Sequence, residues 1–351
     1  MRTAEARRAA VPRLLAAGVL APAEVVDRGV VVTDVSRANR VHLVHVGGPD
    51  GGGAAVKSLG AEAEGGLDAE LRVHALAAER PGLRAALPRL LAEDRAAGWL
   101  ALELVSPGET LTAAHREAIG YPLDLAQAAG RALRAAHDAT RDLAGIPPAP
   151  LPWALSALDP MGPAAFAWEE APLRAVLDGI AEPERHRAAL AEARADWRPA
   201  CLMHGDLKWD NCLVARPVRA AACTVRIIDW EGAGAGDPAW DVAGLVQEYL
   251  AYAALMVLDA GGAVRPDALH RALEPVAAAV RALLGAYGAD ASWVERSMRF
   301  AGARLVQTSL EHASRGAAGD RAAAVTLMRL ALPLLEAPAA AAALLDEAGA
   351  A

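Results

Sequence analysis

Alternating hydrophobic and polar residues predict three short strands in succession near the start of the chain. They are GVVVTDV (29–35), RVHLVHV (40–46) and GAAVKSL (53–59), and GGPDGGG supplies a hairpin-type turn between the last two. The next segment, AELRVHALAAER (69–80), has helical spacing, and WLALELV (99–105) is typical of a further strand. We therefore expect residues 1–105 to form a small antiparallel sheet with one or two helices.

Beyond residue 105 the hydrophobic residues recur mostly at helical spacing. The expected helices cover residues 124–140, 184–197 and 239–258 and three alanine-rich stretches after Pro266. Two segments between them differ, because CLMHGDLKWDNCLVAR (201–216) and CTVRIIDWEGAGAGDP (223–238) each combine a short apolar strand with acidic residues and glycines. Residues 106–351 are therefore expected to form a larger, mostly helical domain that carries a β-hairpin.

The first 24 residues resemble a secretory signal in placing arginines before a short apolar stretch. Pro12 and Arg13 leave only LLAAGVLAPA as the apolar core, however, which is at the weak end for a signal. The same residues suit a short amphipathic helix, and no run in the sequence approaches the length of a membrane span. We therefore expect a cytoplasmic protein without membrane contact.

Composition and charge exclude some classes of partner. The 351 residues, 54% of them hydrophobic and 22% charged, are enough for one large or two smaller globular domains. A net charge of -8 lacks the basic surface that a sequence-independent nucleic-acid binder needs, so no nucleic-acid partner is expected. Cys201, Cys212 and Cys223 are too few for a disulfide framework, and we expect buried or incidental thiols.

Three short motifs contain the residue types that phosphoryl transfer from a nucleotide requires. The reaction needs oxygen ligands for Mg2+, a cation on the phosphates and a base that orients the attacking hydroxyl. HGDLKWDN (204–211) places Asp206 five residues before Asn211, and IIDWEG places Asp229 directly after an apolar strand. Lys57 lies in the third strand, with Glu70 on the following helix to pair with it. Alone each element could merely cap a turn, but together and in this order they indicate a phosphotransferase.

The use of lysine is informative in this chain. Among its 35 lysine and arginine residues only Lys57 and Lys208 are lysines, and both lie in these motifs. Lysine and arginine are not interchangeable where a compact charge must approach a phosphate. We predict that Lys208, two residues from Asp206, contacts the transferred phosphoryl group and contributes to catalysis.

The motifs resemble those of the aminoglycoside phosphotransferase family, the small-molecule branch of the protein-kinase-like fold. HGDLKWDN is similar to that family's HGD-xxxx-N catalytic loop, IIDWEGAGAGDPAWDVA to its metal-binding Asp and GDP-x-x-D segment, and GRALRAAHDAT to the preceding helix. The resemblance implies an α+β fold that is bilobal and protein-kinase-like, with a small antiparallel β-sheet N-lobe (1–105) and a large, mostly helical C-lobe (106–351). It also implies ATP and Mg2+ as cofactors.

The resemblance implies roles for residues of the catalytic motifs. Asp206 would orient the substrate hydroxyl and accept its proton, while Asn211 and Asp229 would bind Mg2+ between the nucleotide phosphates. His204 would brace the loop through hydrogen bonds, and Asp241 would hold the loop from below.

A second group of residues would bind the nucleotide. Lys57 would contact the α- and β-phosphates and be held by Glu70, with Glu62 and Glu64 as alternatives. The loop DVSRANR (34–40) lacks the glycine-rich pattern of protein kinases, which makes its polar residues candidates for the phosphate contact. The remaining candidates are Ser36 and Asn39 for the phosphates, Val41 over the adenine, and backbone groups from Glu103 to Val105 at the adenine edge.

Two tryptophans and four acidic residues accompany the motifs. Trp240 is expected in the core, and Trp209 either in the core or as a wall of the substrate site. The acidic residues are most simply interpreted as a solvated face, although a cationic substrate would also favour them. They are Glu109, Glu169, Glu170 and Asp241.

The acceptor stays open between two classes. One is a small hydroxylated molecule such as an aminoglycoside, a choline-like alcohol or a homoserine-like amino acid. The other is Ser or Thr of a natural-product precursor peptide, as in lanthipeptide-type biosynthesis with a separate lyase partner, and Lys208 favours it modestly because serine/threonine kinases carry a lysine there. A catalytically weak pseudokinase that acts as an ATP-binding scaffold or partner subunit is the alternative of a different class. The presence of the base, both metal ligands and the strand lysine argues against it.

Overall fold

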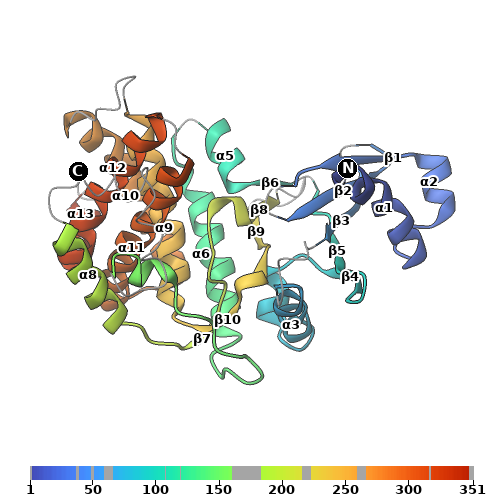
Figure 1. Ribbon diagram of the computed structural model, residues 1–351, viewed down its shortest axis with the longest axis horizontal. Helices are drawn as coiled ribbons and strands as arrows, with labels where there is room; N and C mark the ends of the chain where they lie inside the picture. The colour runs from blue at the N-terminus through green and yellow to red at the C-terminus, as the bar shows by residue number, and fades with distance from the viewer. Residues whose placement is uncertain are drawn as a thin grey trace.

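The computed structural model describes residues 2–36, 39–48, 51–58, 66–106, 108–118, 120–159, 183–215, 223–258, 266–315 and 318–347. A small sheet with short helices lies at one end of the molecule and a larger helical part at the other (Figure 1). Four candidates named above lie outside the described residues, namely Glu62, Glu64, Glu169 and Glu170.

The small sheet has five antiparallel strands in the order β1-β2-β3-β5-β4. They are β1 (Val30–Asp34), β2 (Arg40–Val46), β3 (Gly53–Ser58), β4 (Leu90–Asp94) and β5 (Trp99–Glu103). The four strands expected from alternation are confirmed. Strand β4 was not expected, because its sequence LLAED does not alternate and a register shift after Leu90 interrupts its pairing with β5.

Helices cover both faces of this sheet. Neighbouring residues of β5 point to opposite faces, and each of them packs against a different helical segment. Trp99 packs with Leu14 and Leu20 of the N-terminal segment, which forms α1 (Arg2–Ala16) and α2 (Pro22–Arg28). Leu100 packs with Leu71 of α3 (Gly66–Glu79), after which comes the short helix α4 (Pro81–Ala86). The amphipathic N-terminal helix is confirmed.

The larger part is mostly helical and contains two small sheets. Strands β6 (Gly108–Thr110), β8 (Cys212–Ala215) and β9 (Thr224–Ile227) form one, and β7 (Cys201–Met203) pairs with β10 (Gly234–Gly236). The helices are α5 (Leu111–Glu117), α6 (Leu123–Asp138), α8 (Pro183–Ala195), α9 (Pro238–Met256), α10 (Pro266–Tyr287), α11 (Ala291–Arg315), α12 (Ala318–Glu336) and α13 (Pro338–Glu347), with the 3-10 turns η1 (Trp153–Ser156), η3 (Trp209–Asn211) and η4 (Trp230–Gly232). The expected hairpin is β8–β9, and the predicted α+β architecture is confirmed.

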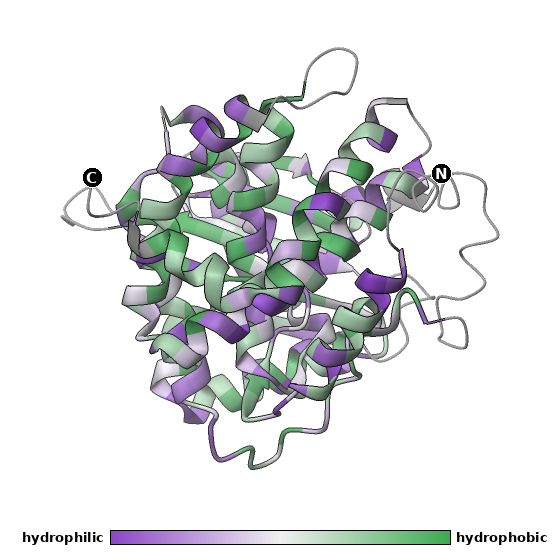
Figure 2. Cartoon of the chain, turned by 90° about the vertical axis from the view of Figure 1, so that its left-hand side faces the viewer, coloured by the Kyte–Doolittle hydropathy of each residue, from purple (hydrophilic) through white to green (hydrophobic). Residues whose placement is uncertain are grey.

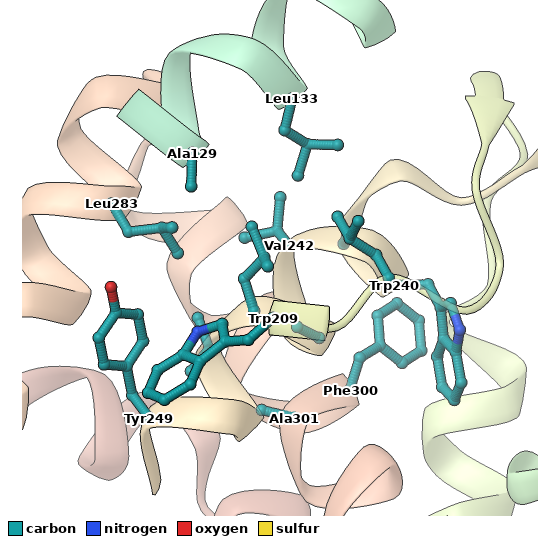
Figure 3. Packing of buried hydrophobic residues seen from close by; sticks show 14 of the residues in the cluster. Ala129, Leu133, Trp209, Trp240, Val242, Tyr249, Leu283, Phe300 and Ala301 are labelled. Atoms are coloured by element: carbon teal, nitrogen blue, oxygen red, sulfur yellow. The ribbon is translucent and has the colours of Figure 1, made fainter. Parts of the chain in front are cut away.

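The core of the helical part forms around large aromatic side chains from the catalytic motifs. Trp209 packs edge-on against Tyr249 of α9, and Trp240 packs edge-on against Phe300 of α11 (Figure 3). Hydrophobic and hydrophilic residues occur within the same helices (Figure 2), whereas α9 is buried along most of its length. The core position expected for Trp240 is confirmed, and all three cysteines are buried and free, as predicted.

Among the described residues, no single helix is long and apolar enough to cross a membrane. Helices α12 and α13 meet that test of length and composition only as a pair, and they are bent by 99° relative to each other.

Candidate active site

Side chains of α9 hold the backbone of the loop after β7. Asp241, near the start of α9, accepts hydrogen bonds from the N–H of His204 at 2.7 Å and of Gly205 at 3.0 Å. Trp240 donates its indole N–H to the carbonyl of Gly205 at 3.0 Å. Gly205 has φ +87°, a conformation that a residue with a side chain rarely adopts. Two neighbouring side chains of α9 and the backbone conformation of Gly205 therefore fix the position of Asp206.

Asp241 is fully buried, so the interpretation of this residue as part of a solvated face is wrong. Burial alone would raise its pKa, but the hydrogen bond and charge of His137 together with the backbone N–H of His204 hold the pKa below its ordinary value. The Nε2 atom of His137 lies 3.2 Å from Asp241, and its Nδ1 atom lies 2.9 Å from the hydroxyl of Tyr287. A buried ionised carboxylate thus organises the loop, in the role that the resemblance implied.

His204 braces the loop against the strand that carries Asp229. Its Nε2 atom faces the carbonyl of Ile228 at 2.8 Å, and its Nδ1 atom accepts the N–H of Asp206 at 3.2 Å. These partners require a neutral ring with the proton on Nε2, because a carbonyl only accepts and an amide only donates. The bracing role predicted for His204 therefore has a defined geometry.

The carboxylate of Asp206 lies between two cations. Lys208 donates to Oδ2 at 2.6 Å, and Nη2 of Arg304 lies 3.6 Å from Oδ1. Partial burial would lower the pKa of Lys208, but the charge of Asp206 and their hydrogen bond raise it. Both Asp206 and Lys208 keep a large part of their side chains exposed, at 47% and 40%. Within the described residues 201–215, most of which are buried, these two side chains thus place a carboxylate and an ammonium group together at the surface.

Asn211 directly precedes β8 and Asp229 follows β9, at the same end of the β8–β9 hairpin. The side-chain N–H of Asn211 donates to the carbonyl of Asp206 at 2.9 Å, so its oxygen Oδ1 is the atom left to bind a ligand. The carbonyl of Asn211 accepts the N–H of Ile228 at 3.0 Å, which sets Asp229 beside it. Asp229 has left-handed backbone angles (φ +69°), which Asp tolerates better than most residues.

This donor set fits a hard divalent cation. Mg2+ prefers one or two protein oxygens and completes its shell with phosphate oxygens and water. In the part of the chain that the structure describes, no group of three His, Cys, Asp or Glu side chains forms a metal site. An amide oxygen and a carboxylate are therefore enough only if the nucleotide supplies the remaining ligands.

Lys57 is a buried lysine that contacts three carboxylates, of which Glu70 is buried and Asp229 and Glu231 are partly exposed. Its Nζ atom donates to Glu70 at 2.7 Å and to Asp229, and lies 3.2 Å from Glu231. Burial would lower the pKa of Lys57, but Glu70 and Asp229 raise it above its ordinary value. The expected contact between Lys57 and Glu70 is present, and the contact with Asp229 joins the small sheet to the segment that follows β9.

The loop between β1 and β2 places its two polar candidates differently. Asn39 donates to Oε2 of Glu231 at 2.6 Å and therefore reaches the Lys57 cluster. The hydroxyl of Ser36 instead accepts the N–H of Val41 at 3.0 Å and closes the turn. Glu231 was missed at the sequence level, although it stands two residues after Asp229.

The adenine candidates come from two strands of the small sheet, Val41 from β2 and Glu103 from the end of β5. Val41 is paired with Lys57 in the β2–β3 register, so the two side chains share a face of the sheet. The N–H of Glu103 donates to the carbonyl of Arg89 at 2.8 Å, and Val105 follows in the connection to β6. Binding of the adenine by these residues stays a prediction.

Two neighbours of the loop were also missed, Arg304 on α11 and Glu248 on α9. Glu248 accepts the backbone N–H of Trp209 and, at 2.7 Å, a side-chain N–H of Gln247. Burial, reinforced by Asp210, raises the pKa of Glu248 to about 7 against the opposing charge of Arg304. The one feature of the sequence that could have indicated these two residues is a charged side chain within an apolar helical stretch.

Trp209 does not form a wall of the substrate site. Its ring is 1% exposed, and it stacks on the ring of His115 with centroids 4.0 Å apart. Of the two interpretations left open, the core position is the one that the structure bears out. Two surface cavities of ≈ 400 Å³ also lie away from this loop, one between η1 and α8 and one against α2.

Comparison with known proteins identifies the family. A model described as the phosphotransferase enzyme family (APH) matches residues 39–287. A choline/ethanolamine kinase family protein from Mesorhizobium loti has a TM-score of 0.60 at 18% identity, with 100% of both chains covered. A choline kinase from Cryptosporidium parvum Iowa II has a TM-score of 0.52 at 13% identity, covering 87% of this chain and 88% of that chain.

A third structure is the GDP complex of aminoglycoside 2'-phosphotransferase-IIIa, with a TM-score of 0.51 at 17% identity over 89% of this chain and 93% of that chain. Comparison with curated proteins gives no match. The structural likenesses show a kinase-like fold. Because the family model covers well over half of the residues, the chain belongs to the phosphotransferase enzyme family, as its motifs predicted.

Proposed function

We propose that this phosphotransferase moves the γ-phosphoryl group of ATP, with Mg2+, to the hydroxyl group of a small molecule that also carries a cationic nitrogen. The convergence of Asp206, Asn211, Asp229 and Lys57 carries the proposal for the reaction. These residues come from β3, the loop between β7 and β8, and the turn after β9, and the contacts of Lys57 with Asp229 and of Asn211 with Asp206 link them.

Each residue has a distinct task in this proposal. The acceptor hydroxyl donates its hydrogen bond to Asp206, its oxygen attacks the γ-phosphorus, and ADP leaves as the proton passes to Asp206. Lys57 holds the α- and β-phosphates, and Lys208 neutralises charge that develops on the transferred group. Asn211 and Asp229 would hold Mg2+, which neutralises the phosphate charge when bound.

The two lobes divide the substrates in this proposal. Residues 1–105 cover ATP, with Val41 on the adenine, backbone groups from Glu103 to Val105 at its edge, and Asn39 and the turn at Ser36 near the phosphates. Residues 106–351 supply the base, the metal ligands and the acceptor site.

Carboxylates beside the catalytic loop support a cationic acceptor. Glu248 contacts the loop at Trp209, and the negative charge of Glu311 on α11 also acts on Lys208. Because Asp206 is assigned to the acceptor hydroxyl, Glu248 and Glu311 are left to interact with a cationic group of the acceptor. Their negative charges would stabilise a cation bound nearby. Two of the structural neighbours are named as kinases of choline or of choline and ethanolamine, which are hydroxylated amines.

The test is phosphorylation from Mg-ATP of three acceptor sets: aminoglycosides, small amino alcohols, and Ser/Thr-rich peptides encoded nearby. We expect turnover with an amine alcohol, and a higher KM for that acceptor, with unchanged KM for ATP, in Glu248→Gln. Turnover with peptides alone would instead indicate that the acceptor is a precursor peptide and that a separate lyase is the partner. Asp206→Asn should lower kcat by about 100-fold or more, and rates equal to wild type would favour the scaffold alternative instead.

A further inference from the structure

Arg304 is a buried arginine whose guanidinium group faces the catalytic loop from α11. It is 5% exposed. Its Nη2 atom donates to the carbonyl of Leu207 at 2.9 Å, and its Nη1 atom donates to Gln307 at 3.1 Å. A buried cation is stable only when hydrogen bonds and opposite charge compensate its desolvation. Here the loop itself provides that compensation.

Neighbouring residues fix the plane of this guanidinium group. It lies over the ring of Trp240, 5.3 Å from the centroid, and the same indole donates to the carbonyl of Gly205. Arg304 and Trp240 therefore hold carbonyl groups on either side of Asp206. Stacking restricts the guanidinium to one orientation, so its two donor positions are preorganised.

Gly244 on α9 makes room for this arrangement. A Cβ atom at position 244 would lie 2.4 Å from the carbonyl oxygen of Leu207 and 3.5 Å from Nη2 of Arg304. Any side chain there would push the loop away from the helix. The absence of a side chain at position 244 thus lets α9 approach the loop at Leu207, where Arg304 of α11 donates its hydrogen bond.

The charge of Arg304 also acts on the carboxylate of Asp206. Its Nη2 atom is 3.6 Å from Oδ1, too long for a good hydrogen bond but within ion-pair range, while Lys208 occupies Oδ2 at 2.6 Å. With one cation on each oxygen, the carboxylate cannot rotate without losing one of them. The orientation of its lone pairs toward an incoming hydroxyl is therefore set from both sides.

We propose that Arg304 is a positioning residue for phosphoryl transfer, which fixes the backbone at Leu207 and the orientation of the Asp206 carboxylate. This inference rests on the proposed phosphotransfer at Asp206 but not on the identity of the acceptor. It predicts an effect on kcat rather than on nucleotide binding, since Arg304 contacts the loop and not the Lys57 cluster.

The test compares Arg304→Gln and Arg304→Lys with Arg299→Gln. Arg299 lies on the same helix but pairs with Asp196 at 3.6 Å, away from the loop. The activity assay is hydrolysis of Mg-ATP with water as acceptor, and the second readout is amide hydrogen exchange of residues 204–211. Arg304→Gln should lower kcat about 10- to 100-fold, leave KM for ATP within about twofold, and speed exchange in the loop about tenfold or more.

Arg304→Lys should recover only part of kcat, because an ammonium group keeps the charge but lacks the planar fork that serves both Leu207 and Gln307. If Arg304→Gln does not fold, the comparison of Arg304→Lys with wild type tests the proposal. Arg299→Gln should match wild type in both readouts. Wild-type kcat and loop protection in Arg304→Gln or in Arg304→Lys would overturn the proposal.

The two proposals fail in different ways. A wrong acceptor leaves ATP hydrolysis intact, and the kinetic comparison then still decides the role of Arg304. Absence of any ATP turnover in the wild-type chain would refute phosphotransfer itself. In that case the catalytic part of the role of Arg304 fails with it, and exchange in Arg304→Gln decides only whether Arg304 fixes the backbone at Leu207: faster exchange supports this, and unchanged exchange overturns it.

Discussion

Replacing Glu248 by Gln should make stability depend on pH in a defined direction. The side chain is partly buried beside Lys208 and Arg304, with Asp210 as a like charge, and its pKa is raised from 4.5 to about 7. Between these values the folded chain holds a proton that the unfolded chain has released, so this group lowers the stability as the pH rises through the window. A shift of this size corresponds to about 3 kcal/mol above pH 7.

Gln at position 248 removes this destabilisation, but it also has one hydrogen-bond-accepting oxygen fewer than Glu. Glu248 accepts from both Trp209 and Gln247, and a Gln side chain can serve one of these donors, which costs about 1 kcal/mol. The net gain for Glu248→Gln is therefore about 2 kcal/mol at pH 8.5, or a rise in Tm of about 3 °C. At pH 5.5 the gain should be close to zero.

Thermal unfolding of both proteins at pH 5.5 and pH 8.5 measures the difference. Glu311→Gln is the matched control, because this exposed carboxylate accepts from Gln307 at 2.9 Å and should leave Tm unchanged at both pH values. A difference in Tm between Glu248→Gln and wild type that is the same at both pH values would refute the reasoning.

Four further substitutions test the remaining contacts. Lys208→Ala should lower kcat by about one to three orders of magnitude with little change in Tm, and wild-type turnover would remove its catalytic role. Lys57→Met leaves Glu70 buried without its cation and should lower the free energy of unfolding by about 3 kcal/mol, while adding Glu70→Gln should restore stability in urea titrations but not activity. Asp241→Asn deprives His204 or Gly205 of an acceptor and should lower both Tm and kcat, with a cost of about 2 kcal/mol; equal Tm would contradict this.

Local sequence determined the elements and the catalytic loop. Alternation in β2 alone distinguishes buried from half-exposed positions, because neighbouring side chains of a strand point to opposite faces. The residues from His204 to Asn211 are close in the chain, so their order constrains their geometry directly. Lys57 and Glu70 follow the same logic, since β3 and α3 are consecutive elements. What alternation could not detect was β4, whose pairing depends on a neighbour rather than on its own pattern.

Only the tertiary structure decided which distant side chains surround Asp206. Helical spacing in α9 and α11 predicts that each helix buries one face, but it does not say which loop that face meets. Arg304 and Glu248 therefore carried no motif, and their roles arise from the packing allowed by Gly244. The same packing buried Trp209, and the approach of the small sheet brought Asn39 to Glu231. The sequence thus determined the chemistry available, whereas docking of the helices and the sheet determined its orientation, because contacts between remote segments depend on packing that no local pattern records.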